Sequence, residues 1–425
     1  MVRQQDKLSR SIVVPERGAA LLAKNDWAIL SQETAFWDLC RNKVIAVDVT
    51  QQGHHKLSGS CYTGEATLGP IRLILAEKFP GATNALLDAL HPGKRKVVDA
   101  AGPGKHDYDA LRALVLRFTA SVRTYLSGLR KIRYIDEFLT GTIAGGRLDV
   151  RGTLKLRING KGHKLAFRRS GITSNLPYNL CIYAALKQVE RLAIKAEIPT
   201  SQVAMARALR APLADCERTT SLHTPDQIKK LARQQSQDNA SSRPELAVPI
   251  ALASSILDAT PDEINENSGV TVRSSWFVNL ENLFEASLRN CIRRQLHGSF
   301  RVTAPKQRPD LFKPDLGRYR ANPDVVVKNE LGACAMIADA KYKDIDGWPA
   351  ASDVHELLAH AAGYHSPLAV IFYPSDAEFR SKAFGTSVTN CAVLSIGVRF
   401  SHFEHDVARG LMLAGILADI SLHGV

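Results

Sequence analysis

The sequence lacks several features that would assign it at once to a class of protein. No apolar run approaches the roughly 18 residues of a membrane span, and the first residues lack the apolar core of a signal peptide. We therefore expect a cytoplasmic protein without membrane contact. The seven cysteines are scattered without a CxxC or Cys/His cluster, which argues against a zinc site or a disulfide scaffold and for reduced core thiols.

A phosphate-binding loop of the Walker A type is also missing. Neither Gly104-Lys105 nor Gly160-Lys161 has the leading glycine, the spacing and the following Ser or Thr of that loop. We expect this chain to bind no nucleotide, so any nucleotide hydrolysis would have to come from another chain. The 425 residues allow two or three domains, and the formal charge of +13 suits an anionic partner.

One stretch predicts a β-hairpin that carries a chemical site. The two apolar strands are Val325–Val327 and Ala333–Ala338, joined by a polar turn that ends in glycine. Asp324 opens the first strand and Asp339 follows the second. Lys341 lies two residues past Asp339, on the same face by the period of two.

These residue types in this order suit phosphodiester hydrolysis, and the pattern resembles the PD-(D/E)xK nuclease superfamily. That reaction requires a hard cation, and Mg²⁺ prefers one or two carboxylates together with waters. Asp324 and Asp339 could supply the carboxylates, with the carbonyl of Ala340 as a further oxygen. Lys341 would orient the water or offset charge on the phosphorane. The alternative is a plain solvent-facing hairpin, although an aspartate at the end of an apolar strand meets a desolvation cost unless it is paired or metal-bound.

Residues 261–425 are expected to form one domain around this hairpin. An apolar residue at every third or fourth position predicts a helix from Trp276 to Leu296. A further helix at Ala351–Tyr364 and apolar strands at 368–373 and 392–398 would complete a mixed central sheet flanked by helices.

Two features precede the hairpin within this domain. Nucleases of the PD-(D/E)xK superfamily place a glutamate from the preceding helix beside the strand carboxylates, and the resemblance implies Glu285 for that role. The alternative for Glu285 is an exposed acid that pairs with Arg289 at i+4. The basic segment from Arg301 to Arg320 would suit a phosphate backbone, with a surface loop as the alternative.

The first 260 residues are expected to form two further domains, 1–106 and 107–260. The first is β-rich, with strands at 44–49 and 71–75. The second begins with an amphipathic helix over 107–140.

The later part of this second domain is predicted to be helical except at one stretch. Helices are expected at 177–196 and 245–257. Between them, the polar stretch 221–244 is predicted to be a loop-like connection around a short helix at 226–234.

A basic hairpin is predicted between the helix over 107–140 and the helix at 177–196, with strands at 154–158 and 164–168 and a turn at 159–162. No acidic residue lies between Asp149 and Glu190. We expect a phosphate-contacting surface here, and the alternatives are a solvated basic face or a surface for an acidic protein partner. Its basic residues are Arg151, Lys155, Arg157, Lys161, Lys164, Arg168 and Arg169.

The motifs and their order resemble the McrC subunit family of the McrBC 5-methylcytosine restriction system. The resemblance covers about residues 140–365. It rests on Gly146-Arg-Leu-Asp-Val150, Asn175-Leu-Pro-Tyr-Asn179 with the helix through Ala185-Leu186, Leu283-Phe-Glu285, Pro323-Asp324, Asp339-Ala-Lys-Tyr-Lys343 and Asp353-Val-His-Glu-Leu-Leu-Ala-His360.

The resemblance implies an α/β (α+β) protein in which an N-terminal β-rich and helical region docks on a partner and a C-terminal PD-(D/E)xK endonuclease domain cuts DNA. The partner would be a GTP-hydrolysing AAA+ subunit of the McrB type, and the cofactor Mg²⁺, with Mn²⁺ as an alternative. Glu285, Asp324, Asp339 and Lys341 match the catalytic pattern, and Glu285, Asp324, Asp339 and the Ala340 carbonyl are the implied metal ligands.

The chain departs from the family at two positions on the helix after the lysine. The family usually has Gln and, four residues later, Tyr, where this chain has Glu356 and His360. A glutamate there would put a negative charge near the phosphate or add a metal ligand. A stand-alone RecB-like repair or processing nuclease, using the same catalytic residues without a motor, is the alternative function. The candidates for DNA binding are Arg301, Lys306, Arg308, Arg318, Arg320, Lys343, Glu356 and His360.

Overall fold

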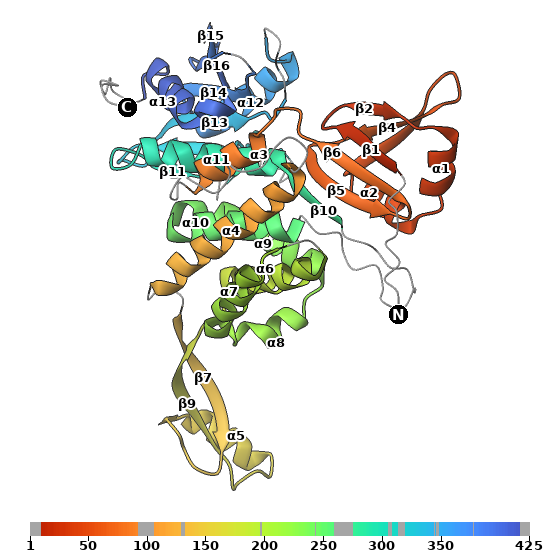
Figure 1. Ribbon diagram of the computed structural model, residues 1–425. Coiled ribbons are helices and arrows are strands. Elements are labelled where there is room, and N and C mark those ends of the chain that lie inside the picture. Colours follow the sequence, from red (N-terminus) through yellow and green to blue (C-terminus); the bar gives the residue numbers. More distant parts are fainter. Residues whose placement is uncertain are drawn as a thin grey trace, which may run out of the picture.

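The computed structural model describes residues 10–91, 106–128, 132–195, 198–242, 244–258, 275–304, 308–312, 319–343, 345, 348–376 and 378–416. Figure 1 shows a β-rich unit at one side, a layer of helices that carries a long projection, and a sheet flanked by helices at the opposite end from the projection. The chain is therefore a mixed α/β protein, as predicted. No helix within the described ranges combines the length and the apolar character that crossing a bilayer requires.

The β-rich unit consists of two sheets around one apolar core. Its strands at 45–49 and 71–76 confirm the two strands predicted there. The four-stranded sheet has the order β1 (Arg10–Pro15), β6 (Ile71–Ala76), β5 (Tyr62–Leu68) and β10 (Ser275–Asn279). The three-stranded sheet has the order β2 (Ala19–Leu21), β4 (His55–Gly59) and β3 (Ile45–Val49), and the helices are α1 (Lys24–Leu30) and α2 (Thr34–Arg41).

Strand β10 shows that the β-rich unit is built from distant parts of the chain. It pairs antiparallel with β5, and Gly64 allows this close approach because a Cβ there would clash with the carbonyl of Trp276. The predicted helix from Trp276 is therefore wrong in its first turn. Trp276 and Val278 are buried in the larger of the apolar cores, called the main core below, and Phe277 is buried in the core of the β-rich unit. The segment is therefore a strand covered on both sides, although its apolar spacing is typical of a helix.

Helix α3 (Ala82–Leu90) also crosses the predicted division of the chain. It packs on α11 (Leu280–Gln295), where Ser287 Oγ donates to the Leu86 carbonyl (2.8 Å) and Asn290 Nδ2 donates to the Leu90 carbonyl (2.7 Å). The domains 1–106, 107–260 and 261–425 stay a prediction, and packing joins the first to the third.

The helical layer corrects two predictions. The helix predicted over 107–140 ends at Ser127, and the stretch 221–244 is no loop, because α9 spans Pro225–Ser242. Ile228 and Ala232, one turn apart, are buried in the main core, so a narrow apolar stripe is enough to hold a helix that is otherwise polar. The helices are α4 (His106–Ser127), α6 (Pro177–Lys195), α7 (Thr200–Arg210), α8 (Cys216–Ser221), α9 and α10 (Pro244–Asp258).

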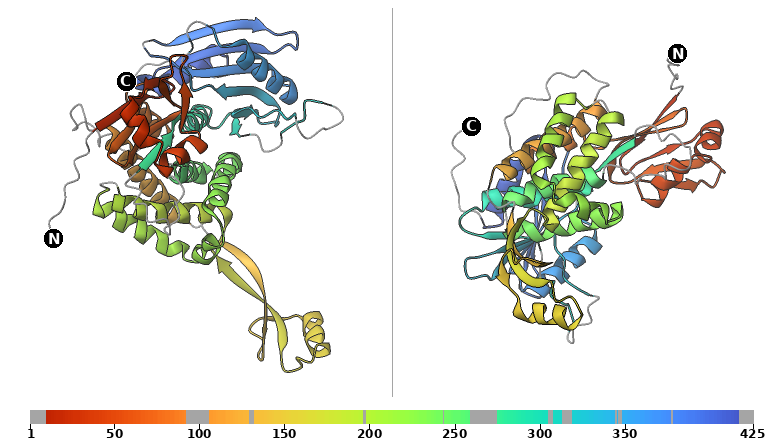
Figure 2. Two further views of the ribbon diagram at one scale, coloured as in Figure 1. Left: turned by 90° about the vertical axis from the view of Figure 1, so that its right-hand side faces the viewer. Right: turned by 90° about the horizontal axis from the view of Figure 1, so that it is seen from below.

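The projection, which we call the stalk, comprises residues 133–173 and extends away from the helical layer (Figures 1 and 2). It consists of β7 (Arg133–Gly141), β8 (Arg147–Leu148), α5 (Val150–Ile158) and β9 (Leu165–Thr173). The predicted strand at 154–158 is wrong, because Asp149 caps a helix there by accepting a hydrogen bond from the Gly152 amide (3.1 Å).

The sheet that carries the predicted site has six strands in the order β11 (Arg301–Thr303), β12 (Val325–Lys328), β13 (Cys334–Ala340), β14 (Leu368–Pro374), β16 (Ala392–Val398) and β15 (Arg380–Thr386). Strands β13, β14 and β16 are parallel and the other pairs are antiparallel, so the sheet is mixed. The hairpin and the strands at 368 and 392 are confirmed.

Alternation along β13 decides which helix each side chain meets. Met336 and Ala338 join the core under α11 and α13 (Phe403–Leu413), whereas Ile337 joins the core under α12 (Ala351–Tyr364). Asp339 therefore lies on the α12 face of the sheet.

Candidate active site

The two strand carboxylates lie together where β12 begins and β13 ends. Asp324 directly precedes β12, and Asp339 is the last residue but one of β13. The Ala340 amide donates to Asp324 Oδ2 (2.7 Å), and the Asp324 amide donates to Asp339 Oδ1 (3.4 Å). These two bonds fix the aspartates relative to each other.

Lys341 lies between two carboxylates. Its Nζ is 3.4 Å from Asp339 Oδ2 and 2.8 Å from Glu356 Oε2. Burial disfavours the charge, but the two carboxylates outweigh it and raise the pKa of Lys341 above its ordinary value. Lys341 is therefore an ammonium at neutral pH, which can donate hydrogen bonds and offset negative charge but cannot take a proton from water.

Glu285 on α11 is buried near other negative charges, as the strand carboxylates are. Burial, and then the negative charge of Asp324, raise the pKa of Glu285 to about 8. Burial, and then the charge of Asp339, raise the pKa of Asp324 to about 7, and burial also raises the pKa of Asp339. The three acids predicted as metal ligands are thus close enough to repel one another.

Arg289, one turn after Glu285, is a part of the site that sequence reasoning placed only as an ion-pair alternative. Its side chain is buried, and its Nε donates to the carbonyl of Asp324 (2.9 Å). Its charge lowers the pKa of Glu285 and of Asp324, although not enough to offset burial and repulsion. Arg289 therefore holds the main chain at Asp324 and partly neutralises the acids.

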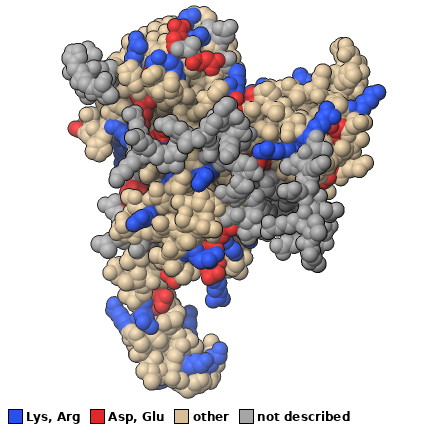
Figure 3. Space-filling model, viewed as in Figure 1, with Lys and Arg blue, Asp and Glu red and all other residues tan. Residues whose placement is uncertain are grey.

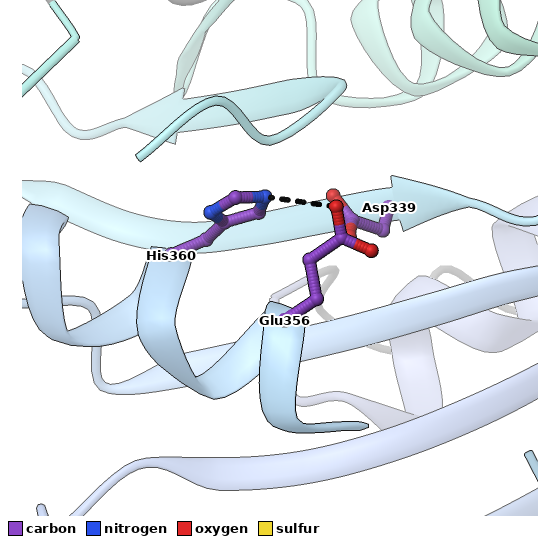
Figure 4. A group of neighbouring side chains, drawn as sticks. All are labelled: Asp339, Glu356 and His360. Carbon is purple, nitrogen blue, oxygen red and sulfur yellow. Dashed lines mark ion pairs between the residues drawn. The ribbon is translucent and has the colours of Figure 1, made fainter. Parts of the chain in front are cut away.

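Helix α12 brings two further side chains to the site. Glu356 and His360, one turn apart, point toward Asp339 (Figure 4), and one ligand atom from each of the three residues lies within 4.8 Å of the others. His360 is 8% exposed, burial lowers its pKa, and its Nδ1 is 3.3 Å from the Asn322 amide. These two residues were predicted to contact DNA, and only the fold reveals that Glu356 contacts Lys341.

The donor set suits a hard divalent cation. All the predicted side-chain ligands are carboxylates, and Asp324 keeps one oxygen beyond the one that accepts the Ala340 amide. Asp339 Oδ2 is buried and, within the part of the chain described, has no hydrogen-bond partner, although the Lys341 ammonium lies 3.4 Å away. A bound cation would relieve both the repulsion and this unsatisfied oxygen.

The DNA-binding candidates occupy different settings. Arg301, Arg308 and Arg320 are exposed, whereas Lys306 and Arg318 lie outside the described residues. Lys343 forms an ion pair with Asp353 on α12.

The basic residues of the predicted hairpin belong to the stalk, which lies on the opposite side of the helical layer from the six-stranded sheet (Figure 1). Figure 3 shows Lys and Arg side chains on the stalk. The stalk also exposes apolar side chains, so its surface is not purely basic; they include Tyr134, Phe138, Ile143, Val150 and Ile158.

Tyr342 connects the site strand with the β-rich unit. It is 1% exposed, its ring contacts Phe79 and Phe284, and its hydroxyl donates to Glu16 Oε2 (3.2 Å). Burial raises the pKa of Glu16 to about 7. The residue after Lys341 is therefore bound to a buried acid 326 positions earlier in the chain.

We expect Tyr342→Phe to lower the free energy of unfolding by about 1–3 kcal/mol, because Glu16 Oε2 would lose a hydroxyl donor in a buried setting. Thermal melting at neutral pH measures the effect. Tyr319→Phe is the matched control, because Tyr319 is 54% exposed. Equal melting temperatures for the two variants would show that the buried hydrogen bond contributes nothing.

The fold and the site define a mixed α/β protein with a cluster of acids and one lysine at the open end of a β-hairpin. The chain belongs to the family described as McrBC 5-methylcytosine restriction system component, whose model matches residues 86–374. This confirms the family predicted from the motifs, and the chain is a component of a restriction system.

Two solved structures to which the chain is similar come from Thermococcus gammatolerans. One is a half-complex of a tetradecameric assembly of McrB AAA+ hexamers with bound McrC, with 14% identity, a TM-score of 0.46 and coverage of 95% of this chain and 99% of that chain. The other is the McrBC complex, with 14% identity, a TM-score of 0.37 and coverage of 67% of this chain and 88% of that chain. No curated protein matches the chain.

Proposed function

We propose that this chain is the McrC-type subunit of its restriction system and hydrolyses phosphodiester bonds in DNA as a Mg²⁺-dependent endonuclease, with Mn²⁺ as an alternative ion. One observation carries the proposal: Asp324 and Asp339 are joined by two backbone hydrogen bonds, Lys341 Nζ lies 3.4 Å from Asp339, and Glu285 is close enough for the charge of Asp324 to raise its pKa. Buried carboxylates without enough opposite charge are costly, and the three acids share only two cations, Lys341 and Arg289. Here the acids stay in excess, as a cation site requires.

The residues divide the chemistry among them. Glu285, Asp324, Asp339 and the Ala340 carbonyl would hold Mg²⁺, which when bound polarises the phosphate and lowers the pKa of the attacking water. Lys341 stays protonated and stabilises negative charge that develops on the phosphate oxygens. Arg289 keeps Asp324 in place through the carbonyl of that residue.

The family and the missing Walker A loop both support the proposed partner. The family is that of a 5-methylcytosine restriction system, and the sequence has no Walker A loop. We propose that a GTP-hydrolysing AAA+ subunit of the McrB type supplies nucleotide hydrolysis in the cytoplasm, and that the chain cuts DNA only together with it.

Plasmid cleavage tests this function. The purified chain, alone and with its AAA+ partner, is incubated with Mg²⁺ and GTP and with plasmid that either carries or lacks 5-methylcytosine. We expect cleavage only when the chain, the partner, GTP and Mg²⁺ are all present. Replacing GTP with a non-hydrolysable analogue and adding EDTA are the controls.

Two outcomes would contradict the proposal in different ways. Mg²⁺-dependent cleavage by the chain alone, without GTP, would keep the site but favour the stand-alone nuclease. Cleavage that persists in EDTA would remove the metal-dependent chemistry.

A further inference from the structure

The Lys341 ammonium is held from two secondary-structure elements at once. Asp339 on β13 lies 3.4 Å from its Nζ and Glu356 on α12 lies 2.8 Å from it. The Lys341 side chain is 20% exposed and that of Glu356 is 52% exposed. A long lysine side chain loses rotamer freedom when it is held in this way, so two carboxylates that flank it define where its charge lies.

The hydrogen bond at His360 Nδ1 determines what the other ring nitrogen can do. The Asn322 amide donates to Nδ1, and a neutral imidazole has one accepting and one donating nitrogen. Nε2 therefore carries the hydrogen. It faces Glu356 Oε1 at 3.9 Å, too far for a direct hydrogen bond but close enough for the N–H dipole to favour this position of the carboxylate, whose other oxygen contacts Lys341.

A metal ion held by Asp339, Glu356 and His360 is the competing explanation, because their ligand atoms lie within 4.8 Å of one another. A metal at His360 Nε2 needs the lone pair of that nitrogen, and Nδ1 would then carry the hydrogen and oppose the Asn322 amide. The metal would also have to displace the Lys341 ammonium, which already lies beside both carboxylates. Two existing contacts would be lost.

We propose that Glu356 and His360 are positioning residues for Lys341 and not metal ligands: His360 orients the Glu356 carboxylate, and Glu356 holds the ammonium beside Asp339. The proposal rests on the proposed nuclease function. The hydrogen bond from the Asn322 amide to His360 Nδ1 also connects α12 with the segment that carries Asp324, because Asn322 lies two residues before Asp324. The pair of residues at which the chain departs from its family thus acts as a unit.

Cleavage kinetics of the complete complex test the positioning role. We expect Glu356→Gln to lower kcat about 10-fold and Glu356→Ala about 100-fold, the size of effect typical of residues that orient a functional group, with the KM for DNA unchanged. His360→Phe should cost about 10-fold, and His360→Gln less, since its amide can still donate. Glu330→Gln is the control, because Glu330 is an exposed acid in the turn at the far end of the same hairpin.

Mn²⁺ binding to the DNA-free protein, measured by calorimetry, separates the two explanations without relying on activity. Glu356→Gln and His360→Phe should bind Mn²⁺ as the wild type does, whereas Asp339→Asn should lose it. Weakened binding in either α12 variant, or a Glu356→Gln rate equal to that of Glu330→Gln, would overturn the proposal. A wild-type complex that does not cleave would overturn the proposed function instead, and Mn²⁺ binding would still decide whether Glu356 is a ligand.

Discussion

Asp339→Asn is expected to lower the rate of DNA cleavage by the complete complex about 10³-fold or more, without unfolding the protein. Asp339 accepts a hydrogen bond from the Asp324 amide and lies 3.4 Å from Lys341 Nζ. In the proposed site its carboxylate is a ligand of the ion that stabilises charge on the phosphate. Such stabilisation amounts to several kcal/mol, and each 1.36 kcal/mol corresponds to about a tenfold change in rate.

The control for this prediction is Asp376→Asn, because Asp376 is exposed. We expect this control to cleave at the wild-type rate. The melting temperature of Asp339→Asn should equal or exceed that of the wild type, because burial already favours the neutral form of this carboxyl. Cleavage by Asp339→Asn at more than a tenth of the wild-type rate would remove Asp339 from the reaction.

Lys341→Ala tests whether the lysine contributes to both cleavage activity and stability. It removes the cation that lies between Asp339 and Glu356, so activity should fall while the melting temperature also falls. A variant that lost activity but gained stability would show that the lysine acts as a strained group and not as a partner of the two acids.

The hairpin was readable from the sequence because everything that defines it is local. Val325 and Ala338 are register partners only 13 positions apart. The period of two along a strand then shows that Asp339 and Lys341 lie on the same face of the sheet. Helix α12 was readable for the same reason, since apolar spacing within 14 residues decides its buried face.

The stalk was misread because its decisive contacts are not local. Strand β7 forms because residues 133–141 pair with residues 165–173, and the sequence of residues 133–141 does not predict that pairing. The sequence pattern at 107–140 therefore predicted one long helix. Asp149, whose side chain caps the start of α5, was the local signal that could have revealed the second error.

The candidate site was likewise only half readable. The acids and Lys341 follow one another along the hairpin, but Glu356 contacts Lys341 from another layer and Glu16 contacts Tyr342 from the opposite end of the chain. Spacing within a helix shows that Glu356 and His360 share a face, but it cannot show which strand residue that face meets. Such contacts depend on the packing of α12 on β13, which periodicity alone does not determine.

The metal-free protein is expected to become less stable as the pH rises from about 4.5 to about 8, and Mg²⁺ is expected to restore the loss at the upper end. The pKa of Glu285 is raised to about 8 and that of Asp324 to about 7, above their ordinary values. An acid whose pKa is raised by folding binds more protons in the folded state than in the unfolded state throughout that interval. The free energy of unfolding therefore falls with rising pH, is highest below the unfolded pKa values and levels off above the folded ones.

Melting temperatures across this pH range, with EDTA or with Mg²⁺, measure both parts of the prediction. Without metal we expect a decrease of about 1–3 degrees toward pH 8, because each kcal/mol shifts the melting temperature of a protein of this size by only about 1 degree. Mg²⁺ should raise the melting temperature most near pH 8, where the acids are ionised, and least near pH 5, where protons compete for the same oxygens. The double variant Glu285→Gln, Asp324→Asn should reduce the slope of the profile in EDTA to the part that Glu16 and Asp339 contribute, and it should lose the response to Mg²⁺. If the double variant kept the wild-type slope, the acids of this site could not be the groups that burial and mutual repulsion destabilise, and the case for a cation among them would lose its physical basis.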